Sequence, residues 1–245
     1  MKCGVSSFVL PDWPAPPGVR ALATTRQGGV SCAPWHSLNL AAHVGDDPRA
    51  VAENRQLMRR RLPAEPLWLN QVHGIRCVDA ALAEAGTEAD ASFTRQRGVV
   101  CAVLTADCLP VLLCDDRAAV VAIAHAGWRG LAAGVIEATV AAMGEPGTRL
   151  MAWLGPAIGP QAFEVGDEVR EVFAARDPQA ASAFVAAGKG KWRCDIRQLA
   201  RQRLHALDIR RVTSADFCTV GEAERFFSYR RDGVTGRMAS LIWLE

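Results

Sequence analysis

The sequence predicts a compact fold that mixes α-helices with β-strands. Half of the 245 residues are hydrophobic, which is enough for a sizeable core at this length. Several short apolar runs have almost no polar alternation, as is typical of strands covered on both faces. Other segments carry apolar residues at helical spacing. We therefore expect one domain over residues 1–245.

The composition disfavours nucleic acid and membrane partners. Lys and Arg number 28 against 26 Asp and Glu, so no strong basic surface is expected. Residues 1–18 contain one lysine and a short apolar run that prolines interrupt, unlike a signal peptide or a membrane span. These features predict a cytoplasmic protein that acts on a small molecule. Its eight cysteines are then expected to remain thiols or to bind metal.

The first third of the chain predicts strands and one helix. A strand is expected at residues 19–25, followed by a glycine-containing turn at 26–31 and a helix at 48–61. Two short strands at residues 67–69 and 75–78 and a polar connection at 80–89 follow. Arg26 lies at the end of the first strand. Pro48 opens the helix, and Asp47 is placed to cap it. His73 falls in the turn between the two short strands.

The rest of the chain predicts apolar strands followed by helices. Three strands are expected at residues 98–104, 110–114 and 118–124, and others at 150–154, 210–213 and 238–244. Helices are expected at residues 127–143, 166–176, 178–187 and 195–207. Asp195 is placed to cap the last helix. A rigid loop rich in glycine and proline occupies residues 155–160.

Cys108, His125 and His73 are the candidate metal ligands. Cys108 and His125 lie at the ends of buried strands, where side chains face a crevice more often than a core. Two imidazoles and a thiolate can hold zinc in a tetrahedral site that keeps one position open. His36 and His43 compete for the imidazole positions, because sequence spacing alone does not exclude them. Other cysteines are interpreted as buried apolar residues: Cys77, Cys101, Cys114 and Cys194.

Arg26, Arg129 and Arg231 are candidates for binding an anionic group. A guanidinium presents a fork of donors that matches phosphate or carboxylate oxygens. Arg26 is favoured because it lies between a strand and two glycines, with the polar Ser37 and Asn39 nearby in sequence. One of several aromatic residues could stack on a planar substrate, the candidates being Trp35, Trp128, Phe226 and Tyr229.

Motifs along nearly the whole chain resemble those of the YfiH family, which is also labelled multicopper polyphenol oxidoreductase, laccase domain, and peptidoglycan editing factor. They occur in the family's order, at residues 24–26 (TTR), 28–31 (GGVS), 37–40 (SLNL), 43–47 (HVGDD), 53–55 (ENR), 71–74 (QVHG), 105–112 (TADCLPVL), 125–130 (HAGWRG), 155–160 (GPAIGP) and 226–233 (FFSYRRDG). Several specific motifs in this order make a chance match implausible.

The resemblance implies an α+β fold, a four-layer α/β/β/α sandwich with mixed sheets. It implies one zinc ion held by His73, Cys108 and His125, with copper as the less favoured metal. It further implies phosphorolysis of adenosine, inosine, guanosine and methylthioadenosine, together with adenosine deamination. The partners would be a purine nucleoside and phosphate, and the protein a monomer or weak homodimer.

The same resemblance suggests roles for the residues around the metal. With zinc orienting phosphate or water, Arg26 would neutralise the incoming anion. Departure of the purine leaves positive charge on the ribose, so a polar group is needed nearby. Asp107 is the predicted helper. The predicted contacts to nucleoside or phosphate are Arg26, Ser37, Asn39, Gln71 and Arg129.

Three other functions remain open. Cys108 as nucleophile and His125 as base would make a cysteine-type amidase or hydrolase of peptidoglycan precursors. A copper polyphenol oxidase is ranked lowest, because five histidines are too few for a multinuclear copper centre and a separate electron-entry copper. A purely structural zinc is the third alternative, and an open coordination position argues against it.

Overall fold

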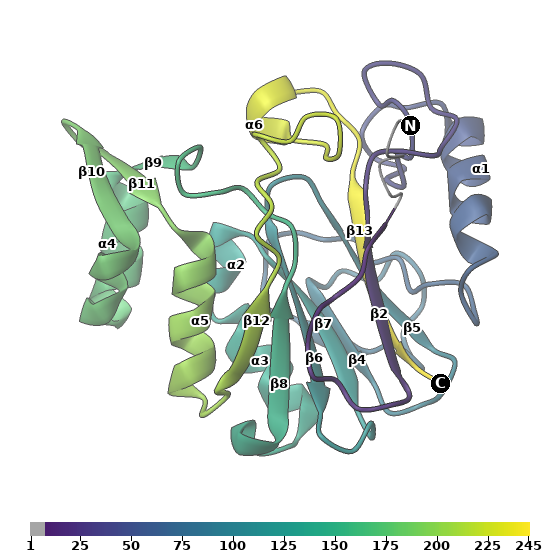
Figure 1. The fold of residues 1–245 in the computed structure, drawn as a ribbon, viewed down its shortest axis with the longest axis horizontal. Helices are drawn as coiled ribbons and strands as arrows, with labels where there is room; N and C mark the ends of the chain where they lie inside the picture. The colour runs from purple at the N-terminus through teal and green to yellow at the C-terminus, as the bar shows by residue number, and fades with distance from the viewer. Residues whose placement is uncertain (1–7) are drawn as a thin grey trace.

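A computed structural model, which describes residues 8–245, contains two large β-sheets stacked between helices (Figure 1). The four-stranded antiparallel sheet has the order β1 (Phe8–Val9), β2 (Val19–Thr24), β13 (Met238–Leu244) and β5 (Val100–Thr105). The six-stranded mixed sheet has the order β12 (Arg211–Ser214), β8 (Leu150–Leu154), β6 (Leu109–Asp115), β7 (Val121–Ala126), β4 (Ala91–Thr94) and β3 (Cys77–Asp79).

Helices cover the outer faces of the two sheets. These are α1 (Pro48–Arg59), α2 (Trp128–Ala133), α3 (Val135–Met143) and α5 (Ile196–Ala206). Two further helices, α4 (Asp167–Arg176) and α6 (Tyr229–Asp232), lie to the side of the sheets and beyond their strand ends, and short 3₁₀ turns occur at Gly147–Arg149 and Pro178–Ala183. In Figure 1, α1 lies beyond the four-stranded sheet, and α3 and α5 lie against the six-stranded sheet. The predicted α+β four-layer class is therefore confirmed.

Three apolar clusters separate the four layers. The first, between α1 and the four-stranded sheet, contains Met58 and Leu241. The second fills the space between the sheets, and the third lies between the six-stranded sheet and α3, where Ile136 is buried. Adjacent residues of β6 face different clusters, since Leu112 belongs to the second and Leu113 to the third. This two-sided burial explains why the predicted strands show no polar alternation.

Most predicted elements are present with shifted ends. α1 begins at Pro48, and the Asp47 carboxylate accepts the backbone N–H of Arg49 at 2.9 Å. Asp195 caps α5 in the same way. The helix predicted over residues 127–143 is instead divided into α2 and α3 at Gly134, whose φ of 111° places it in the left-handed region. A glycine reaches that conformation without steric cost, so it ends α2.

Two stretches differ from the prediction. Residues 67–69 form no strand, only an isolated bridge from Leu67 to Cys101, and the strand expected at residues 75–78 is β3, which begins at Cys77 and pairs in parallel with β4. Residues 178–187 form only the 3₁₀ turn Pro178–Ala183 before the chain enters a strand. In residues 178–187 the alternation of polar and apolar residues is too weak to indicate a strand or the strand it pairs with.

A small three-stranded sheet was not predicted at all. It has the order β10 (Phe184–Gly188), β11 (Lys191–Cys194) and β9 (Glu164–Gly166), and with α4 it forms the lobe at the left of Figure 1. The alanine-rich β10 segment favours helix by local propensity. Hairpin pairing with β11 overrides that preference, since strand formation depends on neighbours more than on the residue itself.

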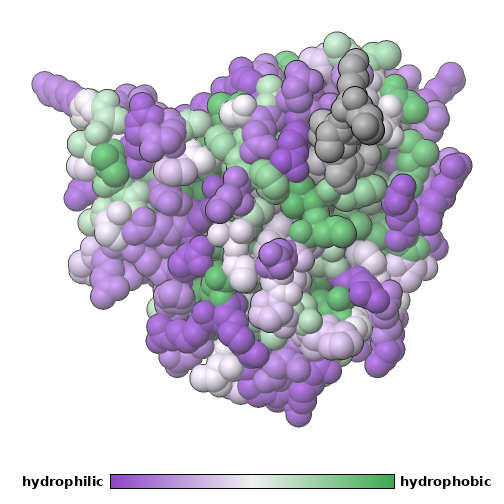
Figure 2. Space-filling model, in the orientation of Figure 1, coloured by the Kyte–Doolittle hydropathy of each residue, from purple (hydrophilic) through white to green (hydrophobic). Residues whose placement is uncertain are grey.

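Figure 2 shows that polar residues cover most of the small lobe and the lower edge of this face, whereas hydrophobic residues show mainly near its middle. Most apolar side chains are instead inside, in the three clusters. Within residues 8–245, no helix combines the length and hydrophobicity needed to cross a lipid bilayer.

Candidate metal centre

Strand pairing brings together residues that lie far apart in the sequence. β6 and β7 are antiparallel, with Pro110 opposite His125, so Cys108 just before β6 comes close to the end of β7. On the other side of β7, Ala91 of β4 lies opposite Ala124. That register places Asp90, directly before β4, beside His125. The sheet therefore assembles this site, and no single loop contains it.

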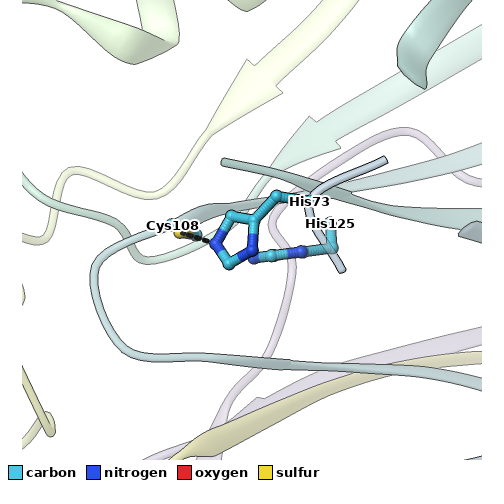
Figure 3. A group of neighbouring side chains, drawn as sticks. All are labelled: His73, Cys108 and His125. Atoms are coloured by element: carbon cyan, nitrogen blue, oxygen red, sulfur yellow. Dashed lines mark hydrogen bonds between the residues drawn. The ribbon is translucent and has the colours of Figure 1, made fainter. Parts of the chain in front are cut away.

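The side chains of His73, Cys108 and His125 converge at this point (Figure 3). Their ligand atoms all lie within 4.8 Å of one another, and Nε2 of His73 is 3.9 Å from Sγ of Cys108. The two imidazole rings meet edge to face, with centroids 4.8 Å apart. His125 is buried, Cys108 is half-buried and His73 is exposed. The group therefore has one side open to solvent.

Asp90 supports both imidazole-bearing segments, although the sequence analysis did not single it out. Its Oδ1 lies 2.8 Å from Nδ1 of His125. The same carboxylate accepts the backbone N–H groups of Val72, His73 and Gly74 at 3.1, 2.9 and 2.7 Å. A carboxylate on one imidazole nitrogen directs the other nitrogen toward a metal. Periodicity could not distinguish this carboxylate from other acidic residues in the same polar stretch.

Close backbone approach around the group requires glycine. A Cβ at Gly127 would lie 2.8 Å from Cδ2 of His73 and 3.1 Å from Sγ of Cys108. A Cβ at Gly130 would lie 2.9 Å from the carbonyl oxygen of Gly74. His73 itself has a φ of 61°, which costs a non-glycine residue about 1–2 kcal/mol. The hydrogen bonds to the loop that contains it offset this strain.

The group also perturbs its own protonation. Burial by itself would raise the pKa of the Cys108 thiol, but His125 and His73 lower that pKa to about 6. Burial would lower the pKa of His125, yet Cys108 and Asp90 raise it to about 9. Thiols without such partners behave differently, because burial raises the pKa to about 12 for Cys77, Cys101, Cys114 and Cys194. Cys108 is therefore primed to be a thiolate.

A tetrahedral metal ion fits this donor set. Zinc bonded to imidazole nitrogen at ~2.0 Å and thiolate sulfur at ~2.3 Å would separate these two atoms by about 3.5 Å at the tetrahedral angle, about 0.4 Å less than the 3.9 Å between His73 and Cys108. Within residues 8–245 the group has these three members, so a tetrahedral ion held there would keep a fourth position for an exogenous ligand. His36 and His43, the competing histidines, lie outside it.

A cavity of about 510 Å³ opens beside the group, within the usual size range of small-molecule sites. Eight residues predicted from the sequence as metal ligands, substrate contacts or stacking aromatics line it, namely Gln71, His73, Asp107, Cys108, His125, Trp128, Arg129 and Tyr229. His43 also lines it, as do Arg230 and Arg237, which the sequence analysis did not propose. Arg237 lies outside the family motifs, and within the motif at residues 226–233 Arg231 was chosen in place of its neighbour Arg230.

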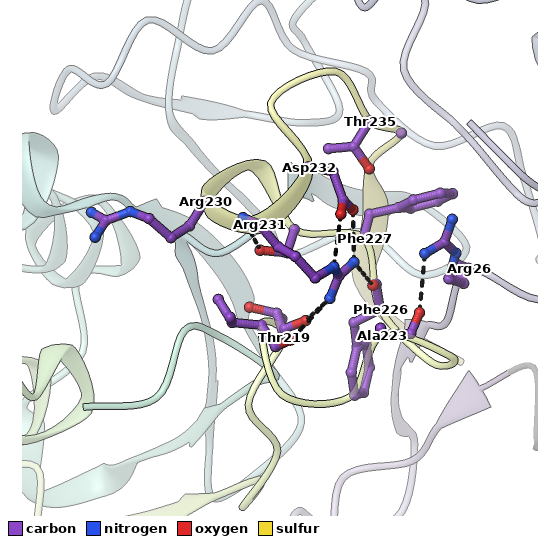
Figure 4. A network of polar contacts seen from close by, with 12 residues as sticks. Arg26, Thr219, Ala223, Phe226, Phe227, Arg230, Arg231, Asp232 and Thr235 are labelled. Carbon is purple, nitrogen blue, oxygen red and sulfur yellow. Dashed lines mark hydrogen bonds and ion pairs between the residues drawn. The ribbon is translucent and has the colours of Figure 1, made fainter. Parts of the chain in front are cut away.

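Arg26 and Arg231 lie outside this cavity, in a neighbouring network (Figure 4). Arg26 donates to the carbonyl oxygens of His36 at 2.8 Å and Ala223 at 3.0 Å, and its guanidinium covers the ring of Phe227. Arg231 pairs with the Asp232 carboxylate and donates to backbone carbonyls. All three nitrogens of the Arg231 guanidinium and two of the three of Arg26 thus have partners within the fold. The prediction that they bind an anion finds no support in this placement.

Ser37 and Asn39 also lie outside the cavity, and they hold its surrounding backbone. Ser37 Oγ accepts the N–H of Gly29 and donates to the carbonyl oxygen of Arg26. The buried Asn39 side chain accepts the backbone N–H of Arg237 at 2.9 Å. Any influence of these two residues on a ligand would therefore be indirect.

Asp107 lines the cavity, but its carboxylate is already well satisfied. It accepts hydrogen bonds from Thr219 Oγ1 at 2.6 Å, Ser228 Oγ at 3.0 Å and the backbone N–H of Arg230 at 2.7 Å. These contacts tie the C-terminal segment to the loop that carries Cys108. Gln71, which also lines the cavity, bridges the backbone carbonyl and N–H of Leu104 in β5.

Comparison with known proteins identifies the family. A family model described as multi-copper polyphenol oxidoreductase laccase matches residues 20–245. A Pseudomonas aeruginosa protein named purine nucleoside phosphorylase is 55% identical over 98% of this chain and 100% of its own length. Purine nucleoside phosphorylase YfiH of Escherichia coli is 53% identical, with the same coverage of both chains.

Solved structures agree with the sequence matches. A Neisseria meningitidis protein of family DUF152 has a TM-score of 0.95 and 52% identity, covering 98% of this chain and 100% of that chain. The YfiH protein of Bacillus licheniformis has a TM-score of 0.89 and 30% identity, covering 99% and 98% of the two chains. The chain therefore belongs to the YfiH family, whose model has the description multi-copper polyphenol oxidoreductase laccase.

Proposed function

We propose that this protein is a zinc-dependent purine nucleoside phosphorylase that acts on adenosine, inosine, guanosine and methylthioadenosine and also deaminates adenosine. The observation that carries the proposal is the convergence of His73, Cys108 and His125 at the edge of a cavity of about 510 Å³. The names of relatives at 53–55% identity support the phosphorylase activity. The zinc, the substrate range and the deamination are our extension of it.

Zinc would be held by His73, Cys108 and His125, and when bound it supplies a Lewis acid for an oxygen of phosphate or water. Copper is the less favoured occupant, since the candidate ligands within residues 8–245 suffice for one ion, whereas a laccase uses a multinuclear copper centre and a separate electron-entry copper. Asp90 holds Nδ1 of His125, so that Nε2 faces the ligand group.

The cavity walls offer contacts for a purine nucleoside. Trp128, Tyr229 and Phe163 line it, and an aromatic ring can stack on a planar base. Asp107 stays in the proposal as the polar group beside Cys108. Because three donors already bind its carboxylate, we assign it the positioning of the Cys108 loop in preference to proton transfer. The general acid for the leaving purine is not among the residues assigned.

The test combines elemental analysis with turnover of inosine and adenosine, each with and without phosphate. We expect about one zinc per chain, release of purine base only with phosphate, and conversion of adenosine to inosine without it. Removal of the metal should stop both reactions, and added zinc should restore them. Purine release that is unaffected by rigorous chelation would contradict the zinc mechanism.

A cysteine-type amidase or hydrolase of peptidoglycan precursors is the second candidate, favoured by one observation. The lowered pKa of Cys108 and the raised pKa of His125 describe a thiolate beside an imidazolium, as a cysteine nucleophile requires. Chelation and alkylation separate the two functions. Hydrolase activity that survives metal removal but is lost on alkylation of Cys108 would favour this candidate.

The remaining parts of the proposal concern the protein as a whole. We expect one domain over residues 1–245, a cytoplasmic location, and a monomer or weak homodimer. Purine nucleoside and phosphate are the proposed partners, with no nucleic acid or membrane involved.

A further inference from the structure

Three arginines line the cavity, and none of them forms an ion pair with a carboxylate of residues 8–245. They are Arg129, Arg230 and Arg237. Arg149, which lies outside the cavity, behaves differently, since it contacts three carboxylates, those of Asp115, Asp116 and Glu145. Among residues 8–245, the only carboxylate on the cavity wall is that of Asp107, which hydrogen bonds already satisfy. The cavity among the described residues therefore carries an excess of positive charge.

Arg237 is the most firmly placed of the three. It directly precedes β13, whose first residue Met238 pairs with Thr105 at the end of β5. This register sets Arg237 beside the segment that leads to Cys108. Its backbone N–H binds Asn39 at 2.9 Å, and its carbonyl oxygen accepts the N–H of Leu40. The main chain of Arg237 is thus fixed on both sides.

The guanidinium of Arg237 is only partly used within the fold. Nη1 donates to the carbonyl oxygens of Thr235 at 2.9 Å and Gly236 at 3.1 Å. Nε and Nη2 have no hydrogen-bond partner in the part of the chain from residue 8 onward. Nη1 fixes one end of the fork, and the other donors are left for a ligand. A guanidinium with two such donors matches two oxygens of phosphate.

The electrostatic surroundings point the same way. Burial lowers the pKa of Arg237, and the charges of Cys108 and Asp107 act in the opposite direction. A half-buried cation is costly unless an anion compensates it. A bound metal ion would neutralise the Cys108 thiolate, and three hydrogen bonds already stabilise the Asp107 carboxylate. The compensating anion then has to come from the ligand.

We infer that Arg237 is the principal residue of an oxyanion subsite in this cavity, with Arg230 and Arg129 on the neighbouring walls, and that inorganic phosphate is its ligand. The inference rests on the proposed function, in which phosphate is the second substrate. It replaces Arg26, which lies outside the cavity and donates to the carbonyl groups of His36 and Ala223. Figure 4 shows Arg230 pointing away from the network that contains Arg26 and Arg231.

The first test measures phosphorolysis by Arg237→Gln and Arg237→Lys. We expect the KM for phosphate to rise about 10-fold to 100-fold in Arg237→Gln, and less in Arg237→Lys, because the charge is kept but the fork is lost. The KM for inosine should change less than about 2-fold. Arg60→Gln, which removes an exposed arginine of the α1 end, is the control. A rise in the KM for inosine with an unchanged KM for phosphate would overturn the assignment.

The second test does not depend on turnover. Binding of inorganic phosphate to zinc-loaded wild type and Arg237→Gln is measured by calorimetry, with metal content matched. If wild type binds phosphate more tightly than Arg237→Gln but does not cleave nucleosides, the phosphate subsite is supported and the phosphorylase function is rejected. If Arg237→Gln carries out phosphorolysis and binds phosphate as tightly as wild type, the phosphorylase function is supported and the subsite is rejected.

A third measurement covers the case in which the variants fail to fold. Wild-type protein is treated with phenylglyoxal, with and without phosphate, and modified arginines are mapped by mass spectrometry. We expect phosphate to protect Arg237 and to leave Arg60 modified. Equal modification of Arg237 under both conditions would overturn the inference.

Discussion

Two polar regions of this protein look alike in sequence and differ in how their side chains are used. One is the metal-ligand group of His73, Cys108 and His125, and the other is the loop that includes Arg26 and Asn39. In the first, ligand atoms lie within 4.8 Å of one another beside an open cavity. In the second, polar atoms bind the backbone of the fold itself. Polar motifs between strands therefore mark either a site or its scaffold.

The loop is held by one buried side chain. Asn54 of α1 donates through Nδ2 to Ser31 Oγ and to the carbonyl oxygens of Ser37 and Asn39, and its Oδ1 accepts the N–H of Val30. Such a satisfied polar hub specifies a conformation, but it leaves no atom for a ligand. The metal-ligand group instead holds its thiolate with two imidazoles and one open side.

Cys108→Ala should have the largest effect on function, because it removes the thiolate ligand from the group. We expect zinc binding to be lost and turnover to fall at least about 1,000-fold, while circular dichroism stays unchanged. Cys32→Ala, at an exposed thiol, should retain both zinc and turnover. An unfolded Cys108→Ala protein would instead indicate a structural metal.

Asn54→Ala should break the second region and leave the first intact. Loss of four hydrogen bonds at a fully buried position is expected to lower the free energy of unfolding by about 2–4 kcal/mol. Urea denaturation measures this, with Glu53→Ala on the exposed side of α1 as the matched control. Zinc content per folded chain should stay the same, and its loss would show that the two regions are coupled.

Asp90→Asn should weaken the metal site without removing a ligand. An amide cannot accept from both His125 and the backbone N–H groups of the His73 loop, since one of its two ends is a donor. We expect zinc affinity to fall about 10-fold to 100-fold, measured by competition with a chelator of known affinity. Asp12→Asn, at an exposed side chain, serves as the control. Unchanged affinity would mean that the loop holds His73 without Asp90.

The rate at which Cys108 is alkylated in metal-free protein should show the smallest of these effects, and it reports on the Cys108 thiolate alone. The pKa of Cys108 is lowered to about 6, so its thiolate persists as the pH falls from 9 and is lost only as the pH falls through about 6. Because the pKa of Cys108 is lower in the folded protein than in the unfolded chain, the thiolate stabilises the folded state fully at a pH above the pKa of the unfolded chain. This contribution is lost as the pH falls through about 6. Iodoacetamide should therefore label Cys108 faster than Cys32 at pH 7. Equal rates across pH 5–9 would contradict the thiolate.

Much of the fold could be predicted from the chain alone. The apolar runs that became β5, β6 and β7 are buried on both faces, and the Pro48 and Asp47 signal marks the start of α1. The β9, β10 and β11 sheet could not be predicted, because its short strands depend on pairing with one another. The break at Gly134 was also missed, since apolar spacing continues across it.

By itself, the sequence determined where the buried strands lie, and it showed that a cysteine and a histidine occur near the ends of two of them. Only the tertiary structure decided which groups meet. The β4–β7 register selects Asp90 as the partner of His125, and the β13–β5 register sets Arg237 beside the Cys108 segment. The physical reason is that periodicity reports local burial along one element, whereas a site depends on the register between strands that are distant in sequence.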